Sequence, residues 1–196
     1  LALKGLDYEY ASVDLLQGGG QQFAAGFKAM NPAALVPVLD DDGTVLTQSL
    51  AIIEYLDETR PQPPLLPADA TGRARVRALA LAIACEIHPL NNLRVLGYLT
   101  KTLGIAEEQR SAWYCHWVET GLATVEAMLA GDPRTGSCCH GDAPTLADTC
   151  LVPQIFNAQR FKARLDHVPT VMRIHQHCLT LPAFARSVPA LQPGAA

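Results

Sequence analysis

The sequence of 196 residues lacks several features that would assign it to a particular class of protein. No apolar run reaches the roughly 18 residues needed to span a bilayer. The first residues do not combine a charged start with an apolar middle, as a signal peptide would. With a formal net charge of −4 and a pI of about 5.8, the chain has no overall basic field that favours nucleic acid or anionic membrane. These absences predict a cytoplasmic protein without nucleic-acid or membrane partners.

The six cysteines form no recognisable metal or disulfide pattern. No C-x-x-C pair occurs, and Cys138, Cys139 and His140 stand together without a second pair of ligands. We therefore expect no metal site and no disulfide framework, and we expect a reducing compartment. Aromatic residues are also scarce, at 6%, whereas hydrophobic residues make up 49%, which favours helices packed with small and aliphatic side chains.

Strand signals are confined to the first quarter of the chain. Residues 8–13 predict a short strand, after a helix end that closes at Gly5. Residues 35–39 and 44–47 predict a hairpin around an Asp-Asp-Gly turn. Ser49 then has the character of an N-cap for an amphipathic helix. The combination predicts an α/β domain over residues 1–60.

The composition changes after a proline-rich link at residues 60–67. Helical spacing runs over an unusually long span, residues 71–103, and again over residues 106–129. Because no strand signal follows about residue 47, we expect an all-helical second domain over residues 68–196.

Thr145 and Asp148 have the spacing of a capping box, in which each side chain accepts a hydrogen bond from the other residue's backbone N–H. Asp148 could also be a catalytic carboxylate, but the capping pattern favours a structural role. We therefore expect Thr145→Ala and Asp148→Ala to damage folding before chemistry.

Two features of the hairpin region indicate ligand binding. The free N–H groups at a helix that starts near Ser49 are a natural seat for a carboxylate. A cis bond at Val36-Pro37 would turn the backbone groups of Val36 outward. The glycine-rich loop at residues 17–20, in contrast, lacks the Lys-Ser/Thr of a phosphate-binding loop.

These features together resemble a cytosolic glutathione transferase, and the detailed motifs resemble its zeta class. The motifs lie along essentially the whole chain, and they are Gly19-Gly20-Gln21-Gln22-Phe23, Asn31-Pro32, Val36-Pro37, Gln48-Ser49-Leu50-Ala51-Ile52-Ile53-Glu54-Tyr55-Leu56, Glu58-Thr59-Arg60-Pro61, Ile87-His88-Pro89-Leu90-Asn91-Asn92-Leu93 and Asn157-Ala158-Gln159-Arg160-Phe161-Lys162. The resemblance implies a thioredoxin-like N-terminal domain, without its first strand in this sequence, and an all-α C-terminal domain.

The resemblance also implies a glutathione site in the first domain. Gln48 and Ser49 would hold the γ-glutamyl carboxylate, and Val36, beside cis Pro37, would pair its backbone with the cysteinyl part. Gln22 would reach the glycyl end. The carboxylate site inferred above from the helix N-terminus near Ser49 agrees with this assignment.

In the second domain, the resemblance places His88 and Asn92 near the cofactor and gives Arg94 and Arg160 to a dicarboxylate-like substrate. Each has a plainer alternative, since His88 could be satisfied locally and Arg94 could be a solvated surface residue. Arg160 follows an apolar helical face, where an unpaired guanidinium would be costly unless an anion or acid meets it.

Zeta-class members are typically maleylacetoacetate isomerases of tyrosine and phenylalanine breakdown, and they are dimers. The resemblance implies that a glutathione thiolate adds to a cis double bond and is eliminated after rotation. The Ser-Ser-Cys-like loop that serves this thiolate matches no position here, so we expect the catalytic residues upstream of Leu1. Three alternatives stay open: maleylpyruvate as substrate, glutathione-dependent dehalogenation, and a non-catalytic glutathione-binding protein.

Overall fold

The computed structural model describes residues 1–192, and it divides into two compact units. The first, here called the N-terminal unit, comprises Leu1–Pro64 and the segment that begins at Ala183, and the helical unit comprises Leu65–Pro182. The predicted domains, 1–60 and 68–196, differ in assigning this last segment to the helical domain. Its Arg186 guanidinium donates to the carbonyl of Ala2 at 2.8 Å, which ties it to the start of the chain. Within residues 1–192, no helix has the length and apolar character of a membrane span.

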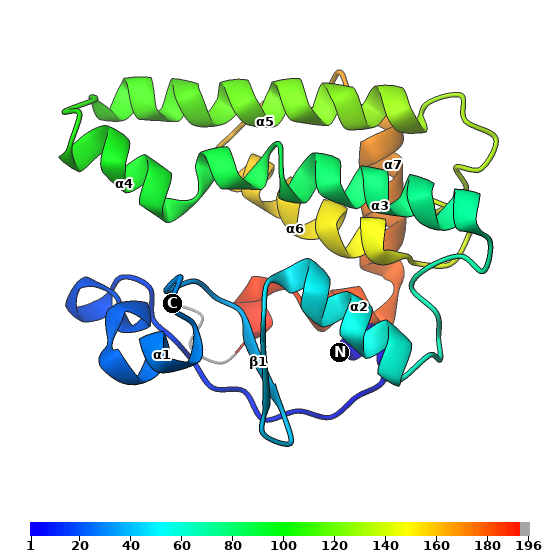
Figure 1. Cartoon of the computed structure of the whole chain (residues 1–196). Coiled ribbons are helices and arrows are strands. Elements are labelled where there is room, and N and C mark those ends of the chain that lie inside the picture. Colours follow the sequence, from blue (N-terminus) through cyan, green and yellow to red (C-terminus); the bar gives the residue numbers. More distant parts are fainter. Residues whose placement is uncertain (193–196) are drawn as a thin grey trace. The chain divides into compact units, whose positions relative to one another are not determined.

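The N-terminal unit is built around one β-hairpin and the helix that follows it (Figure 1). Strand β1 (Val38–Asp41) pairs antiparallel with β2 (Thr44–Thr47), from Val38 opposite Thr47 to Asp41 opposite Thr44. Asp42 and Gly43 turn the chain with φ of 51° and 86°, as a type I′ turn requires. The helices are α1 (Ala25–Met30), α2 (Ser49–Thr59) and the single turn α8 (Pro182–Ala185), with 3₁₀ turns at Ala2–Lys4, Gln17–Gly19, Gln21–Phe23 and Pro189–Leu191.

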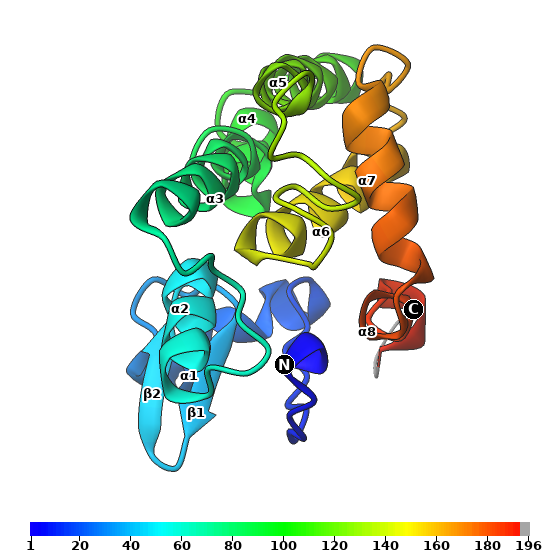
Figure 2. The same cartoon turned by 90° about the vertical axis from the view of Figure 1, so that its right-hand side faces the viewer.

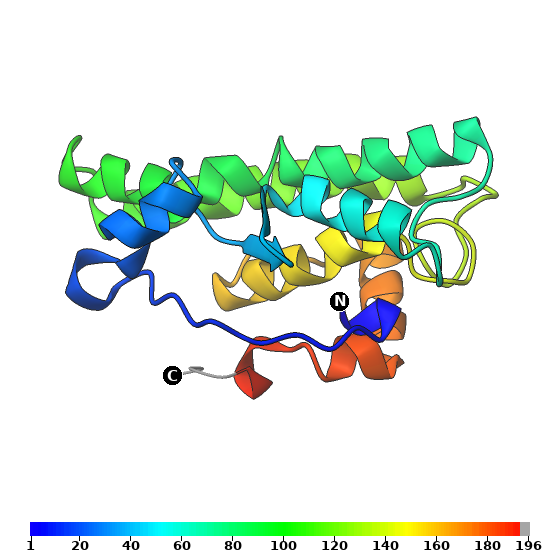
Figure 3. The same cartoon turned by 60° about the horizontal axis from the view of Figure 1, so that its bottom comes forward.

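The strand predicted at residues 8–13 is wrong. Figure 3 shows this stretch as an extended trace without regular structure, and the sheet of the described residues contains β1 and β2 alone. A strand needs a hydrogen-bonded neighbour, which an alternating sequence pattern cannot guarantee. The hairpin is correct, but its first strand begins at Val38 instead of residue 35. Pro37 has no N–H to donate, and the carbonyl of Leu35 accepts from the Asn31 side chain at 2.6 Å.

Two polar clusters stabilise this unit. The Lys4 ammonium, whose side chain is 1% exposed, donates to the Asp57 carboxylate and to the carbonyls of Arg60 and Pro63 at 2.8 to 2.9 Å. On the hairpin, Asp41 accepts from the Tyr55 hydroxyl and from both guanidinium nitrogens of Arg60. These hydrogen bonds hold the pKa of Asp41 below its usual range. Both clusters fasten the C-terminal half of α2 to its surroundings.

The helical unit contains five longer helices. These are α3 (Ala70–Ala84), α4 (Leu93–Lys101), α5 (Glu107–Leu129), α6 (Leu146–Arg160) and α7 (Pro169–Thr180). Figures 1 and 2 show α7 running across the direction of α3, α5 and α6. The core between them consists of fully buried aliphatic side chains, chiefly Val76, Leu79, Ile87, Val118, Leu122, Val125, Leu129, Leu146, Leu151, Ile155, Val171 and Ile174.

The single long helix predicted over residues 71–103 is wrong, whereas the helix predicted over residues 106–129 is confirmed as α5. The chain leaves α3 after Ala84, makes a 3₁₀ turn at His88–Asn91 around Pro89, and starts again as α4. Pro89 cannot donate to a preceding turn, which explains the break. The turn packs closely against α5, because a Cβ at Gly121 would lie 2.3 Å from the Ile87 side chain.

The predicted capping pair forms at the start of α6, although only half of the box is made. The fully buried Asp148 carboxylate accepts from the backbone N–H of Thr145 and from its hydroxyl, both at 2.8 Å. The Thr145 hydroxyl therefore donates to Asp148 instead of accepting from its N–H. Asp148 also accepts from the N–H of Cys139 at 2.8 Å, which fixes the preceding loop on the helix.

Candidate functional site

The Val36-Pro37 peptide bond is cis, as predicted. Val36 is 43% exposed and lies two residues before the ladder begins at Val38. Its backbone N–H and C=O have no hydrogen-bond partner among residues 1–192. An exposed residue with an unused donor and acceptor beside a strand can pair with the backbone of a peptide-like ligand.

Gln48 and Ser49 stand at the N-terminus of α2, but Ser49 is not the N-cap that the sequence predicts. Gln48 occupies the cap position with φ 70° and ψ 115°, and Ser49 is the first helical residue. Neither side chain makes a capping hydrogen bond. Because the first helical N–H groups lack partners within the helix, this exposed end attracts a carboxylate. A non-glycine residue at positive φ is strained, a feature that is common at ligand sites.

The hairpin register brings these two features together. Val38 is paired with Thr47, so the residues just before β1 and just after β2 meet at the same end of the hairpin. Val36-Pro37 and Gln48-Ser49 thus form one surface, here called the hairpin-end site. It combines a free strand-like backbone with a helix N-terminus.

Gln22 belongs to the same unit but is largely enclosed. The residue is 8% exposed, its amide nitrogen is 3.4 Å from the carbonyl of Leu15, and its amide oxygen is buried without a partner among the described residues. Gly20 covers it so closely that a Cβ there would lie 2.6 Å from the amide. The unpaired oxygen is a group that a ligand N–H could satisfy.

His88 and Asn92 flank the 3₁₀ turn that joins α3 to α4. The Asn92 side chain accepts from the N–H of Arg94 at 3.1 Å, so it is the N-cap of α4. His88 is exposed at its surface, yet the surrounding protein withdraws water from the ring and lowers the pKa of its imidazole. A neutral imidazole can both donate and accept a hydrogen bond.

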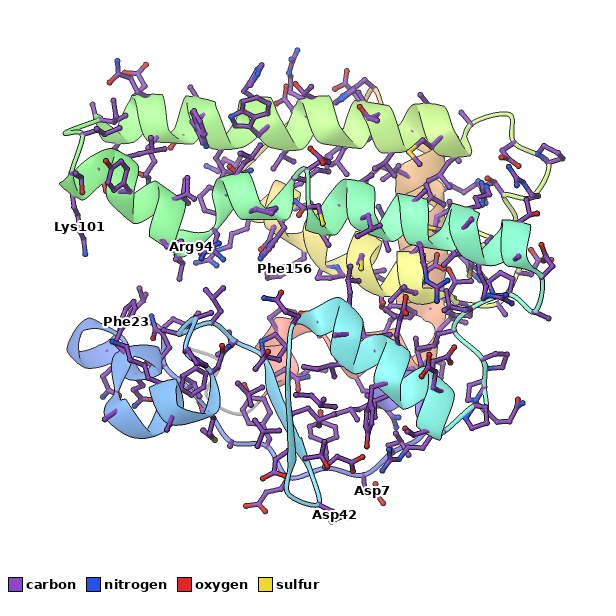
Figure 4. All side chains as sticks on the ribbon, viewed as in Figure 1. Asp7, Phe23, Asp42, Arg94, Lys101 and Phe156 are labelled. Carbon is purple, nitrogen blue, oxygen red and sulfur yellow. The ribbon has the colours of Figure 1, made fainter. Side chains whose placement is uncertain are left out.

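Arg94 and Arg160 are both exposed and have no ion-pair partner among the described residues. Figure 4 shows the Arg94 side chain pointing away from α4 on the side of the helical unit to which Phe156 also points. Arg160 is the last residue of α6, and its guanidinium carbon lies 5.8 Å from the centre of the Phe161 ring. Because Arg160 is exposed, the cost expected for an unpaired guanidinium beside an apolar face does not arise, and its charge is open to an external anion.

A possible metal centre lies elsewhere in the helical unit. Cys138, Asp148 and Cys178 are buried, and their potential ligand atoms lie within 4.8 Å of one another. Each already has protein partners, because the Cys138 thiol is 3.7 Å from the carbonyl of Asp142 and the Cys178 thiol is 3.9 Å from Asp148. Burial and the neighbouring Asp148 raise the pKa of the Cys139 thiol beside this group. Buried thiols that already have hydrogen-bond partners favour a packed core over metal binding.

A polar pocket on the helical unit involves none of the predicted site residues. It is lined by His116, Glu119, Thr120, Arg164, Asp166 and His167. Glu119 accepts from the N–H and the guanidinium of Arg164, so these two charged residues of the pocket are already paired with each other. The pocket is therefore a weaker candidate than the unpaired arginines.

The sequence analysis did not identify Tyr114 as a candidate site residue. Tyr114 in α5 is 4% exposed, and its ring stacks on Phe161 with centroids 3.6 Å apart and an angle of 13°. Its position between two tryptophans at helical spacing is typical of a core residue. No sequence pattern shows that the Tyr114 hydroxyl lacks a hydrogen-bond partner, because this depends on which groups face the hydroxyl in the folded chain.

Residues 1–59 match the family model of the glutathione S-transferase N-terminal domain. The chain is 50% identical over 196 residues to maleylpyruvate isomerase from Ralstonia sp, covering all of this chain and 92% of that protein. It is 47% identical over 195 residues to a probable maleylacetoacetate isomerase from Vibrio cholerae, covering 100% and 90%.

Solved structures give the same result. A maleylpyruvate isomerase described as a bacterial zeta-class glutathione S-transferase superposes with a TM-score of 0.95 at 48% identity, covering 100% of this chain and 91% of that one. A maleylacetoacetate isomerase from Methylobacterium extorquens AM1, solved with malonate and glutathione bound, superposes with a TM-score of 0.95 at 42% identity, with coverage of 100% and 91%. At these identities the likeness extends beyond the fold to the family.

Proposed function

The chain belongs to the zeta class of the glutathione S-transferase family, and from that premise we propose that it isomerises maleylacetoacetate to fumarylacetoacetate with glutathione as cofactor. The observation that carries the proposal is the likeness, over 100% of this chain and 91% of that one, to a maleylacetoacetate isomerase solved with malonate and glutathione bound. Glutathione supplies a thiolate that adds to the cis double bond and leaves after rotation, so it is regenerated. The task of the chain's own residues is to hold the two molecules.

The hairpin-end site fits glutathione. The exposed N-terminus of α2, with Gln48 and Ser49, attracts the γ-glutamyl carboxylate, and the free backbone of Val36 beside Pro37 pairs with the peptide part. The unpaired amide oxygen of Gln22 can accept a hydrogen bond from the N–H of the glycyl residue. The family resemblance alone supports His88 and Asn92 as further glutathione-binding residues.

Arg94 and Arg160 fit the substrate. Both guanidinium groups are exposed and lack a carboxylate partner within the described residues, so they are available to a substrate that carries carboxylates. Arginine binds a carboxylate through two parallel N–H groups, which fixes its orientation as well as its charge. This is the requirement for presenting one double bond of a flexible acid to the thiolate.

Maleylpyruvate is the second candidate substrate, because the 50% identical relative carries that name. Both substrates share the maleyl group and a terminal carboxylate, so the residues above serve either. We expect isomerisation of maleylacetoacetate to be the faster reaction. An assay of each substrate by absorbance, with and without glutathione, tests this order. An α-halo acid in the same assay tests dehalogenation.

Isomerisation that proceeds equally well without glutathione would contradict the proposed mechanism. Glutathione binding with no turnover of any of these compounds would favour a non-catalytic glutathione-binding protein. Faster turnover of maleylpyruvate would reverse the substrate assignment while leaving the enzyme class intact.

We also propose a homodimer in the cytoplasm. The helical unit exposes large apolar side chains, with Leu81 44% and Leu103 56% exposed, which a partner subunit could cover. All six cysteines are free, which fits a reducing compartment. Sedimentation at micromolar concentration tests the dimer, and a monomer would contradict it.

A further inference from the structure

Tyr114 belongs to α5, and its side chain packs against the C-terminal end of α6, where Arg160 lies. Its ring packs face to face on Phe161, the residue that follows Arg160 directly, with 3.6 Å between ring centroids. The backbone carbonyl of Tyr114 accepts from the buried Asn91 side chain at 3.2 Å. These contacts come from two other elements, and together they fix both the ring and the backbone of Tyr114.

The Tyr114 hydroxyl has no hydrogen-bond partner among residues 1–192, although only 4% of the residue is exposed. The hydroxyl oxygen itself is not one of the fully buried unpaired side-chain atoms, so a ligand can reach it. Burial raises the pKa of Tyr114 to about 12, and the nearby charge of Arg160 opposes this rise. The hydroxyl therefore keeps its proton at neutral pH and is available as a donor close to the guanidinium.

Unmet polar groups gather at this place. The amide oxygen of Asn91, which packs on the Tyr114 backbone, is also buried without a partner in the described part of the chain, but it is an acceptor and does not itself favour an anion. Arg160 has no carboxylate to pair with among the same residues. A donor and a cation that both lack an acceptor favour an anion as the missing component.

We propose that Tyr114 is a substrate-binding residue whose hydroxyl donates a hydrogen bond to the same carboxylate that Arg160 binds. A carboxylate offers about four lone-pair sites, so a guanidinium fork leaves room for one further donor. The pair selects a carboxylate over an ester or amide, since only the anion satisfies both groups. The inference rests on the proposed function through the role of Arg160.

Tyr114→Phe tests it, because the ring and its stacking on Phe161 remain while only the hydroxyl is removed. The probe is malonate, a simple dicarboxylate, titrated into the protein by calorimetry. We expect the malonate Kd of Tyr114→Phe to rise about tenfold, since the variant cannot make one hydrogen bond to a charged group. Glutathione affinity and the melting temperature should not change. Tyr98→Phe is the matched control, because Tyr98 is 56% exposed and removal of its hydroxyl should leave malonate binding unaltered.

A second measurement tests whether both groups hold one carboxylate. In an Arg160→Ala background, Tyr114→Phe should weaken malonate binding less than about twofold, because the shared ligand is already misplaced. Equal malonate affinity in Tyr114→Phe and the unsubstituted protein overturns the inference, as does failure of the unsubstituted protein to bind malonate. Tyr114-dependent malonate binding without glutathione-dependent isomerisation would overturn the proposed function and leave the role of Tyr114 standing.

Discussion

The charged residues at the two ends of α6 lie in opposite environments. At its start, Asp148 is fully buried, and its carboxylate accepts hydrogen bonds from Cys139 and from the N–H and hydroxyl of Thr145. At its end, Arg160 is exposed and lacks a carboxylate among the described residues. The first arrangement is complete without any ligand, whereas the second becomes complete only when an anion binds. We therefore expect Asp148 to contribute to stability and Arg160 to ligand binding, although both lie on one helix of 15 residues.

Asp148→Ala should give the largest effect, and it should act on folding. It leaves three buried donors without an acceptor, which costs about 3 kcal/mol or more of unfolding free energy. Urea denaturation measures the decrease, with Asp148→Asn as the milder control because it keeps one acceptor oxygen. The folded fraction should retain normal kcat, so unchanged stability with abolished turnover would show that Asp148 belongs to the chemistry.

Arg160→Ala should show the reverse behaviour. The decrease in kcat/KM for the maleyl substrate should correspond to a loss of about 2 kcal/mol of transition-state stabilisation, as when a charged group is removed from a binding site. The unfolding free energy should change by less than about 0.5 kcal/mol, because the guanidinium has no carboxylate partner among the described residues. Steady-state kinetics and urea denaturation of the same variant give both values.

Arg164→Ala is the matched control for Arg160→Ala. Arg164 is also exposed, but it is paired with Glu119 at 2.8 Å, so its removal should leave kcat/KM unchanged. Equal kinetic effects of the two substitutions would mean that a general decrease in positive charge, and not a specific contact, explains the result.

The local features of the sequence were predictable, and the long-range ones were not. The Asp42-Gly43 turn and the Thr145–Asp148 pair each follow from residues adjacent in sequence, so their chemistry is decided before the chain folds. The strand at residues 8–13 failed because pairing depends on a distant neighbour. The helix over residues 71–103 failed because the apolar spacing continues through Pro89, where the backbone cannot.

The candidate site divides in the same way. The cis bond before Pro37 was expected from the family resemblance and the helix start near Ser49 from the local pattern, and both are found. The cap itself moved from Ser49 to Gln48, since the φ of 70° at Gln48 depends on how the hairpin leads into the helix. The exposure of Arg160 and the unpaired hydroxyl of Tyr114 depend on packing between α5 and α6, which no local pattern encodes.

Ser49→Ala extends the comparison to the N-terminal unit, with a smaller expected effect. The Ser49 side chain makes no capping hydrogen bond, so its removal should change the unfolding free energy by no more than a few tenths of a kcal/mol. The KM for glutathione should rise by a factor of about 5 to 10, which corresponds to about 1 kcal/mol for one hydrogen bond. Steady-state kinetics at varied glutathione checks this. A large decrease in stability with an unchanged KM would make Ser49 a cap after all.

His175 offers a test that depends on pH, because its imidazole carries an unpaired nitrogen in the core of the helical unit. It is 4% exposed on α7, and its Nδ1 is buried without a partner among residues 1–192. Burial lowers the pKa of its imidazole, so the unfolded chain binds the proton more readily than the folded one. The stability that neutral His175 contributes is therefore complete above the unfolded-state pKa of about 6.5 and is lost as the pH falls below it, by at most about 1.4 kcal/mol per pH unit. His175→Leu should remove this part of the acid dependence and leave stability near pH 8 unchanged or higher. Urea denaturation at pH 8 and pH 5 measures it, and an unchanged acid dependence in the variant would assign the effect to the hydrogen-bonded carboxylates instead.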